Sequence, residues 1–562
     1  MSPLNAQSER LSCRADTRED RREMKSLATS AGSHESDVLP RVERLADGLA
    51  CVLERRAVAV IGVLTAIGLS VSALAALRKP FWHDEIVTIL VSRLPLRMIW
   101  AAGRDGVDFF PPLTDVVTHG IGLMFGVGPI VTRLPAIASF WATSLIVFAI
   151  VRRRSNTTVA ATALLLPCLT EAFQYSYEAR GYALMLALFA ASLFAWSEAA
   201  RGHRRGLYLP LLAIVLAAGM WNHYFAVLSI LPLAAGELVR VTRSRRPDWP
   251  MYASILAGGL LALPLAPLMH AAAYGSPSHL DLAGVARLLP GTYQRLIGFL
   301  EGRRFQALFA LVIALGVAER IRRGSYSPGG RALPGHEIAA GLTCLLIPAA
   351  AMFLGAASGA IYIRYALPFV VGLAIVGPLL AWWLSASLVG DVLVGVVVAV
   401  TVAQVGVRGI VQAHIAGPQP VQPHPLLGSG LEGLDPIVLT DVDYLQTWYY
   451  EPPESRSRLW YIADPVGVVE TGTFATPTMD RNLLALRRYA PVGVTDYSSF
   501  VRNTPRFLLF SRWDGHWLPR RLSQDGGRLT RIGGDARGPV FEVVLPTKSG
   551  SAPRASADVS VR

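Results

Sequence analysis

The stretch AVAVIGVLTAIGLSVSALAAL, residues 57–77, determines the class of this protein. It carries no charged residue, and about 20 apolar residues in a row are enough to cross the hydrocarbon core of a bilayer as a helix. It starts too late and is too long for a cleaved signal peptide, so we expect a retained membrane span. The polar segment Arg78-Lys79-Pro80-Phe81-Trp82-His83-Asp84-Glu85 follows it directly.

The rest of the composition agrees with a membrane protein. Of 562 residues, 52% are hydrophobic and 17% are charged, and the mean hydropathy is +0.40. Soluble globular domains carry roughly 25% charged residues. With the first span, the apolar runs predict a polytopic α-helical protein with about eleven transmembrane helices. The further runs lie near 135–151, 157–174, 181–199, 207–221, 224–239, 252–272, 305–320, 338–356, 365–386 and 388–407.

The distribution of charge predicts the topology. The net charge of +13 arises from arginines grouped between apolar runs, such as Arg152-Arg153-Arg154, which is typical of cytoplasmic loops. Nucleic-acid binding is therefore not expected. Two amphipathic stretches, 86–101 and 112–125, are predicted to lie in the membrane interface within the first outward loop. The alternative for the second is a short span, which would place Arg152-Arg153-Arg154 outside. This arrangement places the N-terminus inside and the C-terminus outside.

Four regions follow from these patterns. We expect a disordered cytoplasmic tail over 1–54, a transmembrane domain over 55–415, an extracytoplasmic domain over 416–547 and a disordered tail over 548–562. The extracytoplasmic region is polar and contains short β-like runs at 436–440, 459–463 and 506–510. About 130 residues suffice for a small α/β domain.

The outward loops collect the unusual polar motifs of the chain. Asp84 and Glu85 stand just beyond the first span, where carboxylates are functional candidates and can act as a general base. The alternative is that one of them anchors the loop by an ion pair with Arg78, Lys79 or Arg93.

Two outward arginines are candidates for binding a phosphate. Arg180 opens a predicted span, and Arg364 stands between two tyrosines. Arginine binds phosphate bidentately, and a helix N-terminus after Arg180 would favour an anion. The alternative is that both side chains extend to the lipid headgroups.

Four further residues are assigned to acceptor contact or to shaping of the site: His83, Asp108, Glu178 and His223. Asp108 alternatively caps the helix that follows Pro111-Pro112, and His223 alternatively packs in an interfacial aromatic belt. One histidine with carboxylates is weak evidence for a metal. We therefore predict no metal ligand, and a divalent cation at His83, Asp84, Glu85 and Asp108 is left open.

Taken in order, these motifs resemble those of the GT-C membrane glycosyltransferases, which take sugars from polyprenyl-phosphate carriers. This group includes protein O-mannosyltransferases, the lipid A aminoarabinose transferase and rhizobial lipopolysaccharide galacturonosyltransferases. The resemblance covers about residues 57–410. It is carried by Asp84-Glu85, Asp108-Phe109-Phe110-Pro111-Pro112-Leu113, Arg133-Leu134-Pro135, Glu178-Ala179-Arg180-Gly181-Tyr182-Ala183-Leu184, Asn222-His223-Tyr224-Phe225 and Arg364-Tyr365. Phe110 departs from the pattern, because many relatives carry histidine there.

The resemblance implies an inverting glycosyltransferase with Asp84 as the general base and Glu85 assisting or positioning it. Arg180 and Arg364, with Tyr182 and Tyr365 nearby, would hold the phosphate of the donor. The implied partners are a polyprenyl-phosphate-linked sugar, membrane lipids and an envelope glycan, lipid or protein acceptor. The implied location is the bacterial cytoplasmic membrane, with the site facing the periplasm or exterior.

Two other functions compete with this interpretation. A transporter or flippase of lipid-linked sugars would place functional charges in the middle of the membrane and show pseudo-symmetry. No internal repeat is evident in the sequence. A non-enzymatic envelope scaffold would depend on the C-terminal domain and would tolerate neutralisation of Asp84.

Overall fold

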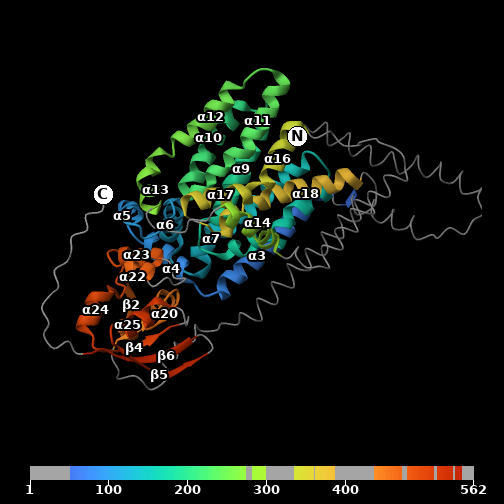
Figure 1. Cartoon of the computed structure of the whole chain (residues 1–562). Coiled ribbons are helices and arrows are strands. Elements are labelled where there is room, and N and C mark those ends of the chain that lie inside the picture. The colour runs from blue at the N-terminus through green and yellow to red at the C-terminus, as the bar shows by residue number, and fades with distance from the viewer. Residues whose placement is uncertain are drawn as a thin grey trace, which may run out of the picture.

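The computed structural model describes residues 51–52, 54–273, 282–298, 334–359, 361–385, 436–470, 477–511, 516–535 and 538–546. Within these residues the chain forms a large helical part and a smaller part built on a β-sheet (Figure 1). The predicted spans at 305–320 and 388–407, both predicted tails apart from residues 51, 52 and 54, and the predicted domain boundary at 415–416 lie outside the described residues.

Six helices are long and apolar enough to cross a membrane, by length and composition, in the described part of the chain. Each corresponds to a predicted apolar run, so the protein is confirmed as a multi-pass membrane protein. They are α3 (Ala57–Arg78), α7 (Pro129–Arg152), α9 (Tyr182–Ala200), α10 (Arg205–Asn222), the pair η3 (Tyr224–Ser229) and α11 (Ile230–Ser244), and the run Trp249–His270, which covers α12 (Trp249–Leu260), η4 (Leu263–Leu265) and most of α13 (Ala266–Ala273).

Three predicted spans differ from simple membrane helices. The run near 338–356 forms α16 (Gly335–Leu345) and α17 (Ile347–Ser358), which meet at a bend of 50°. Pro348 at the start of α17 lacks a backbone N–H, which accounts for the break. The runs near 157–174 and 365–386 give shorter apolar helices. They are α8 (Thr157–Leu165), followed by η1 (Leu166–Leu169) and η2 (Glu171–Tyr177), and α18 (Phe369–Ser385).

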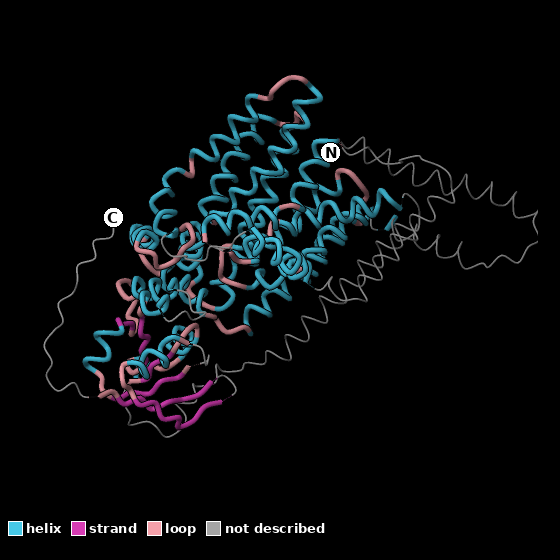
Figure 2. The backbone as a smooth tube through the Cα atoms, viewed as in Figure 1, coloured by secondary structure: helices cyan, strands magenta, loops and turns pink. Residues whose placement is uncertain are grey.

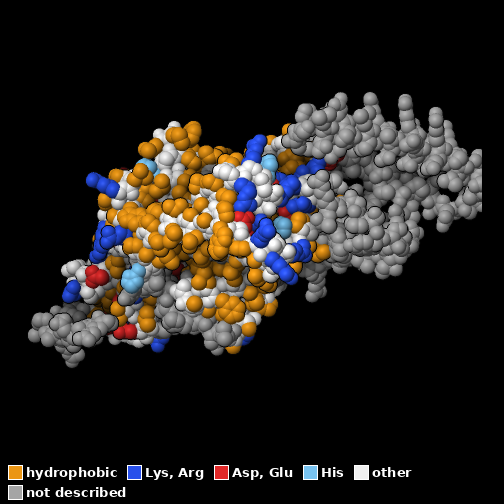
Figure 3. Space-filling model, turned by 90° about the horizontal axis from the view of Figure 1, so that it is seen from above, with side chains coloured by type: hydrophobic (Ala, Val, Ile, Leu, Met, Phe, Trp, Pro, Cys, Tyr) orange, Lys and Arg blue, Asp and Glu red, His pale blue; other side chains and the backbone are white. Residues whose placement is uncertain are grey.

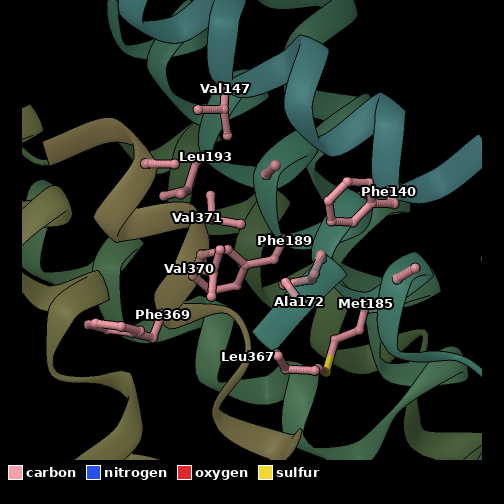
Figure 4. Packing of buried hydrophobic residues seen from close by; sticks show 14 of the residues in the cluster. Phe140, Val147, Ala172, Met185, Phe189, Leu193, Leu367, Phe369, Val370 and Val371 are labelled. Carbon is pink, nitrogen blue, oxygen red and sulfur yellow. The ribbon is translucent and has the colours of Figure 1, made fainter. Parts of the chain in front are cut away.

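The core of the helical part joins segments that are distant in sequence. Phe140 of α7, Phe189 of α9 and Val370 of α18 are fully or almost fully buried and lie in one cluster (Figure 4). The face seen in Figure 3 is broadly hydrophobic, with lysines and arginines gathered in a few groups. An apolar exterior of this kind is suited to lipid contact rather than to water.

Arginines at one end of the bundle pair with acids from neighbouring helices. Arg153 pairs with Glu198, Arg154 with Glu337, and Asp248 accepts from both Arg205 and Arg240. These contacts bring together the ends of α7, α9, α10, α11, α12 and α16. These four arginines therefore lie at a common end of the helical part.

The opposite end carries three short helices between α3 and α7. They are α4 (His83–Ser92), α5 (Leu96–Arg104) and α6 (Leu113–Phe125), and they occupy the two stretches that the sequence predicts as interfacial. The remaining helical segments of the described part are α14 (Leu282–Ile297) and η6 (Ile363–Ala366).

The C-terminal part is an α/β unit whose strands lie at one end of the molecule (Figure 2). Six strands form a sheet in the order β3-β2-β1-β4-β6-β5, in which the first four pair in parallel and β6 pairs antiparallel with both β4 and β5. The three predicted strands are confirmed as β1 (Ile437–Leu439), β2 (Leu459–Ala463) and β4 (Arg506–Phe510). Strands β3 (Val494–Asp496), β5 (Arg528–Asp535) and β6 (Gly538–Val544) add to them. The helices of this part are α20 (Asp443–Tyr450), α21 (Pro453–Arg456), α22 (Pro465–Glu470), α23 (Pro477–Leu486), α24 (Tyr497–Asn503) and α25 (Trp517–Gln524).

The sheet unit packs on the short helices at the outer end of the bundle. Gln446 of α20 donates to the carbonyl of Phe81 at 2.9 Å, and the Tyr450 hydroxyl accepts from the Phe81 N–H at 2.6 Å. Asp105 accepts from Arg488 and Tyr489 at 3.0 and 2.9 Å. A shared apolar core includes Ile86 and Ile99 from the short helices together with residues of β1 and β2. The sheet therefore lies beside the loops that carry the predicted site.

Candidate active site

Asp84 lies in the first turn of α4, at the outer end of the bundle. Its side chain is 24% exposed, and an oxygen lies 3.7 Å from Nη1 of Arg364. The N-terminus of a helix stabilises a carboxylate through the helix dipole. Asp84 is thus an accessible carboxylate beside one arginine, which is an arrangement that allows a general base to receive a proton from an incoming acceptor.

Glu85, the next residue, is completely buried in an ion pair with Arg133. Arg133 Nε donates to Oε1 at 2.7 Å and Nη2 donates to Oε2 at 2.8 Å, so the pair is bidentate. The backbone N–H of Ala179 also donates to Oε1 at 2.8 Å. These contacts favour positioning, the second role predicted for Glu85, over direct proton transfer. The loop-anchoring pair therefore exists, but its partner is Arg133 rather than Arg78, Lys79 or Arg93.

Arg180 is buried beside Asp108. Its Nη1 donates to Asp108 Oδ2 at 2.6 Å and to Thr88 Oγ1 at 3.0 Å, and its guanidinium lies 4.5 Å from the centre of the Phe110 ring. Burial lowers the pKa of Arg180, but the carboxylates of Asp108 and Asp84 outweigh it and raise that pKa above its ordinary value. Arg180 thus remains charged, and Asp108 balances its charge.

Asp108 does not cap helix α6, as the alternative interpretation proposed. The N-cap of α6 is Pro112, and no side chain caps it. Asp108 Oδ1 instead accepts from the N–H of Phe110 at 3.3 Å, while Oδ2 binds Arg180. In the turn before Pro111, the Asp108 side chain points to Arg180. Asp108 therefore contacts the site and its own loop.

Arg364 and the aromatic residues around it form the second part of the site. Its guanidinium lies 5.5 Å from the ring centre of Tyr182 and 4.7 Å from that of Tyr362. The ring of Tyr365 packs against His223, with centroids 4.8 Å apart. Tyr182 and His223 are also neighbours, at 5.8 Å. Residues from α9, η6 and the end of α10 therefore meet opposite Asp84.

Three buried polar atoms in this group have no hydrogen-bond partner in the structure: Arg364 Nε, Tyr182 Oη and His223 Nε2. Buried polar groups are normally paired, so such atoms need an explanation. His223 Nδ1 accepts from the N–H of Phe225 at 3.1 Å, which places the proton of the neutral ring on Nε2. All three atoms are then hydrogen-bond donors. A group of donors beside an arginine is suited to an anionic oxygen.

His223 itself is neutral. Burial, and then the positive charges of Arg364 and Arg180, lower its pKa to about 3. A neutral imidazole in this position can donate a hydrogen bond without adding charge. Phe110, the position at which the sequence departs from the motif, lies 5.0 Å from the His223 ring, so an imidazole lies next to it in the site.

The low pKa of His223 predicts a loss of stability in acid. A histidine in an unfolded chain titrates near 6.5, so between pH 6.5 and about 3 the unfolded chain binds a proton that the folded chain does not. The free energy of unfolding should therefore decrease as the pH is lowered from 6.5 to about 3. His223→Asn keeps an oxygen where Nδ1 accepts and cannot titrate, so its thermal unfolding midpoint should fall less between pH 6.5 and 4. His203→Asn, at a ring that is 55% exposed, is the control. Equal slopes for wild type and His223→Asn would contradict the prediction.

His83 and Glu178 lie at the edge of the site. His83 is 7% exposed, and its Nδ1 has no partner in the structure. Burial lowers the pKa of His83, while the nearby carboxylates of Asp84 and Asp441 oppose that change. Glu178 is buried in an ion pair with Lys79. Glu178 therefore fixes the segment that leads into Arg180, which is compatible with its predicted role in shaping the site.

No group of three histidine, cysteine, aspartate or glutamate side chains is placed to hold a metal ion among the residues that the structure describes. Of the four residues considered for a cation, Glu85 binds Arg133 and Asp108 binds Arg180. Arginine thus occupies two of the three carboxylates considered for a cation.

Three residues at the site were not predicted from the sequence to be functional. Arg133 appeared only as part of a motif, and its pairing with Glu85 spans 48 positions. Thr88 follows Asp84 by one helical turn, a spacing that could have placed it on the same face. Asn222 donates to the Gly181 carbonyl at 2.7 Å and accepts from Thr114 at 2.6 Å. A side chain on Gly181 would collide with these two residues, which explains the glycine between Arg180 and Tyr182.

Comparison with known proteins gives a family match over part of the chain and a shared fold. Residues 110–270 match the family described as dolichyl-phosphate-mannose-protein mannosyltransferase. The crystal structure of ArnT from Cupriavidus metallidurans in the apo state has a TM-score of 0.53 and 13% identity, covering 86% of this chain and 98% of that one. The same protein bound to undecaprenyl phosphate has a TM-score of 0.49 and 14% identity, covering 88% and 99%.

An oligosaccharyltransferase of Archaeoglobus fulgidus, in complex with Zn and sulfate, is more distant, with a TM-score of 0.39, 11% identity and coverage of 79% and 68%. No curated protein sequence matches the chain. The family match over residues 110–270 and the fold shared with apo ArnT confirm that this chain resembles the GT-C membrane glycosyltransferases, as its motifs predicted.

Proposed function

We propose that the chain is an inverting glycosyltransferase, which moves a sugar from a polyprenyl-phosphate carrier to an envelope glycan, lipid or protein. We place the reaction on the outer face of the bacterial cytoplasmic membrane. The observation that carries the proposal is the position of an accessible carboxylate, Asp84, opposite three buried donors that have no partner of their own: Arg364 Nε, Tyr182 Oη and His223 Nε2. The family match and the name of the undecaprenyl-phosphate complex of ArnT agree with a donor of this class.

The proposed step is a single displacement at the anomeric carbon of the donor sugar. Asp84 takes the proton from the acceptor hydroxyl or amine as its oxygen or nitrogen forms the new bond to that carbon. The bond from the anomeric carbon to the phosphate oxygen breaks, and the phosphate leaves with the electron pair. Arg364, with Tyr182 and His223, donates to the oxygens on which the negative charge develops.

The two arginines of the site are expected to contribute differently. Arg180 is already bound to Asp108, so its main effect is to hold the loop and to add a positive field. Arg364 lies 3.7 Å from Asp84, and its Nε has no partner. Of the residues predicted to bind the phosphate, Arg364 is therefore the best placed for direct contact, and Tyr365 supports it through the aromatic cluster.

The experiment that tests the proposal compares envelope glycans and lipids by mass spectrometry in a strain that lacks the chain and in the same strain complemented with it. We expect the loss of one sugar-sized mass in the deletion strain and its return on complementation. A lipid-linked sugar that accumulates whole, with no single product lacking a sugar, would instead favour a transporter or flippase. An unchanged set of glycans and lipids would leave the scaffold as the better description.

Substitution of Arg364 tests the donor site. Arg364→Gln removes the positive charge and the two Nη donors of the guanidinium, and a hydrogen bond to a charged group contributes about 1.5–3 kcal/mol. The KM for a polyprenyl-phosphate sugar should rise about 10- to 100-fold, because each 1.4 kcal/mol is a factor of ten. Arg488→Gln, at an arginine that is 66% exposed on the sheet unit, should not change it. If the Arg364 variant uses the donor as well as wild type does, this residue does not bind the phosphate.

A further inference from the structure

A second site lies at the far end of α4 from Asp84. A cavity of about 200 Å3 opens between the C-terminal end of α4, the second half of α6 and the first turn of α7. Ser92, Arg93, His119, Gly122, Leu123 and Val131 are among the residues that line it. None of the residues placed in the reaction lies in this lining.

The polar part of the lining favours an anion. Arg93 and His119 are its titratable side chains, and no aspartate or glutamate is among the described residues that line it. His119 Nδ1 lies 2.8 Å from the carbonyl oxygen of Ser92, to which it donates. Helix α7, 24 residues long, begins at this cavity without a side-chain cap. Its positive end and the free N–H groups of its first turn add to the charge of Arg93.

The apolar part of the lining lies at the membrane surface. Helix α7 is a candidate span by length and composition, so we expect its first turn to stand near the edge of the hydrocarbon region. The turn that precedes it is apolar and exposed: Leu123, Met124, Phe125 and Val127 are 76%, 69%, 65% and 53% exposed. Such a contiguous apolar turn on a membrane protein is expected to dip into the bilayer. Leu123 and Val127 also line the cavity, so one side of the cavity is apolar and faces the lipid chains while the other side carries Arg93.

This cavity lies too far from the reaction centre to hold the phosphate of the donor. Eight residues of α4 separate Asp84 from Ser92, a rise of about 12 Å at 1.5 Å per residue. In the donor, one oxygen atom joins the phosphorus to the anomeric carbon. A donor phosphate bound at Arg93 could not bring that carbon to Asp84, so the occupant is a different molecule.

From these observations we infer that the cavity binds one anionic phospholipid of the surrounding bilayer. Its phosphate lies between Arg93 and the first turn of α7, and one acyl chain lies over Leu123 and Val127. The bound lipid contacts α4, α6 and α7 at the C-terminal end of α4, which is the end far from Asp84. The inference stands on the cavity, its charge and its place at the membrane, and it does not depend on the proposed transfer reaction.

Two glycines of α6 provide a matched test. Neither Gly120 nor Gly122 has an atom within 4 Å of the place where a Cβ would stand, and both are helical, but only Gly122 lines the cavity. Leucine is favourable in a helix at both positions. Gly122→Leu should therefore fill the cavity, whereas Gly120→Leu should leave it open. Arg93→Glu tests the charge, with Arg97→Glu on the neighbouring helix as its control.

The measurement is native mass spectrometry of the full chain, purified in detergent with added dioleoylphosphatidylglycerol. Wild type, Gly120→Leu and Arg97→Glu should each retain one phosphatidylglycerol, and Gly122→Leu and Arg93→Glu should retain at least tenfold less. Dioleoylglycerol, which lacks the phosphate, should not be retained. Equal retention by all variants, or retention of dioleoylglycerol, would overturn the inference. Retention of added undecaprenyl phosphate in place of phosphatidylglycerol would overturn it in favour of the carrier.

Discussion

Replacement of Asp84 by asparagine is expected to lower the rate of sugar transfer by about 100- to 10,000-fold, the contribution typical of a general base. Asparagine has the same shape but cannot accept the proton of the acceptor. Because Asp84 is 24% exposed and pairs with Arg364 at the long distance of 3.7 Å, the fold should tolerate the change. The measurement is kcat for transfer from a polyprenyl-phosphate sugar by the purified full chain.

Asp105→Asn is the matched control for Asp84→Asn. Asp105 also lies in the outer region of the bundle, but its carboxylate contacts Arg488 and Tyr489 on the sheet unit. Its neutralisation should leave kcat within a factor of about two to three, since an exposed ion pair contributes little. Substantial transfer by the Asp84 variant, with normal expression and folding, would remove Asp84 as the base.

Replacement of Arg133 by methionine should produce the largest loss of stability. Both partners of the Glu85–Arg133 pair are 0% exposed, so the change leaves a carboxylate without its partner inside the protein. Loss of one member of a buried pair costs about 3–5 kcal/mol. Arg133 also donates to the carbonyl oxygens of Ala76 and Lys79, which would lose their donor as well. We expect a correspondingly lower free energy of unfolding in mixed micelles.

Two further variants make the stability prediction specific. The double change Glu85→Leu with Arg133→Met removes both charges and should recover part of the loss, because a buried pair can often be replaced by apolar residues. Arg153→Met is the control at the other end of the bundle, since Arg153 is 27% exposed and Glu198 keeps Arg201 as a partner. If Arg133→Met costs no more than Arg153→Met, the buried pair does not stabilise the outer end.

The predictable part of this protein rests on local patterns. The apolar run at 57–77 predicted α3 almost to the residue, because its length and lack of charge suit a bilayer whatever it packs against. The short runs of β1, β2 and β4 were recognisable for a similar reason, since buried parallel strands are continuously apolar. Strands β5 and β6, which contain glycines, arginines and prolines, lack that signal.

The grouping of the site residues was partly predictable. Alternation of spans, with arginines on one side, placed the motifs around Asp84, Asp108, Arg180, His223 and Arg364 at one end of the bundle, and their contacts confirm it. The membrane thus supplied a constraint that a soluble protein lacks. It limited each motif to one of two ends before any packing was known.

The contacts between these residues could be found only from the tertiary structure. The sequence alone determined a polytopic helical protein with a small α/β unit and a polar end that carries the candidate residues. It could not show that Glu85 is held by Arg133 while Asp84, its neighbour, stays accessible, since that division depends on where Arg133 of α7 lies relative to the first turn of α4. Nor could it show that three donors remain unpaired opposite Asp84. Local propensity and periodicity act over one or two helical turns, whereas these pairings depend on how helices that lie tens of residues apart come together.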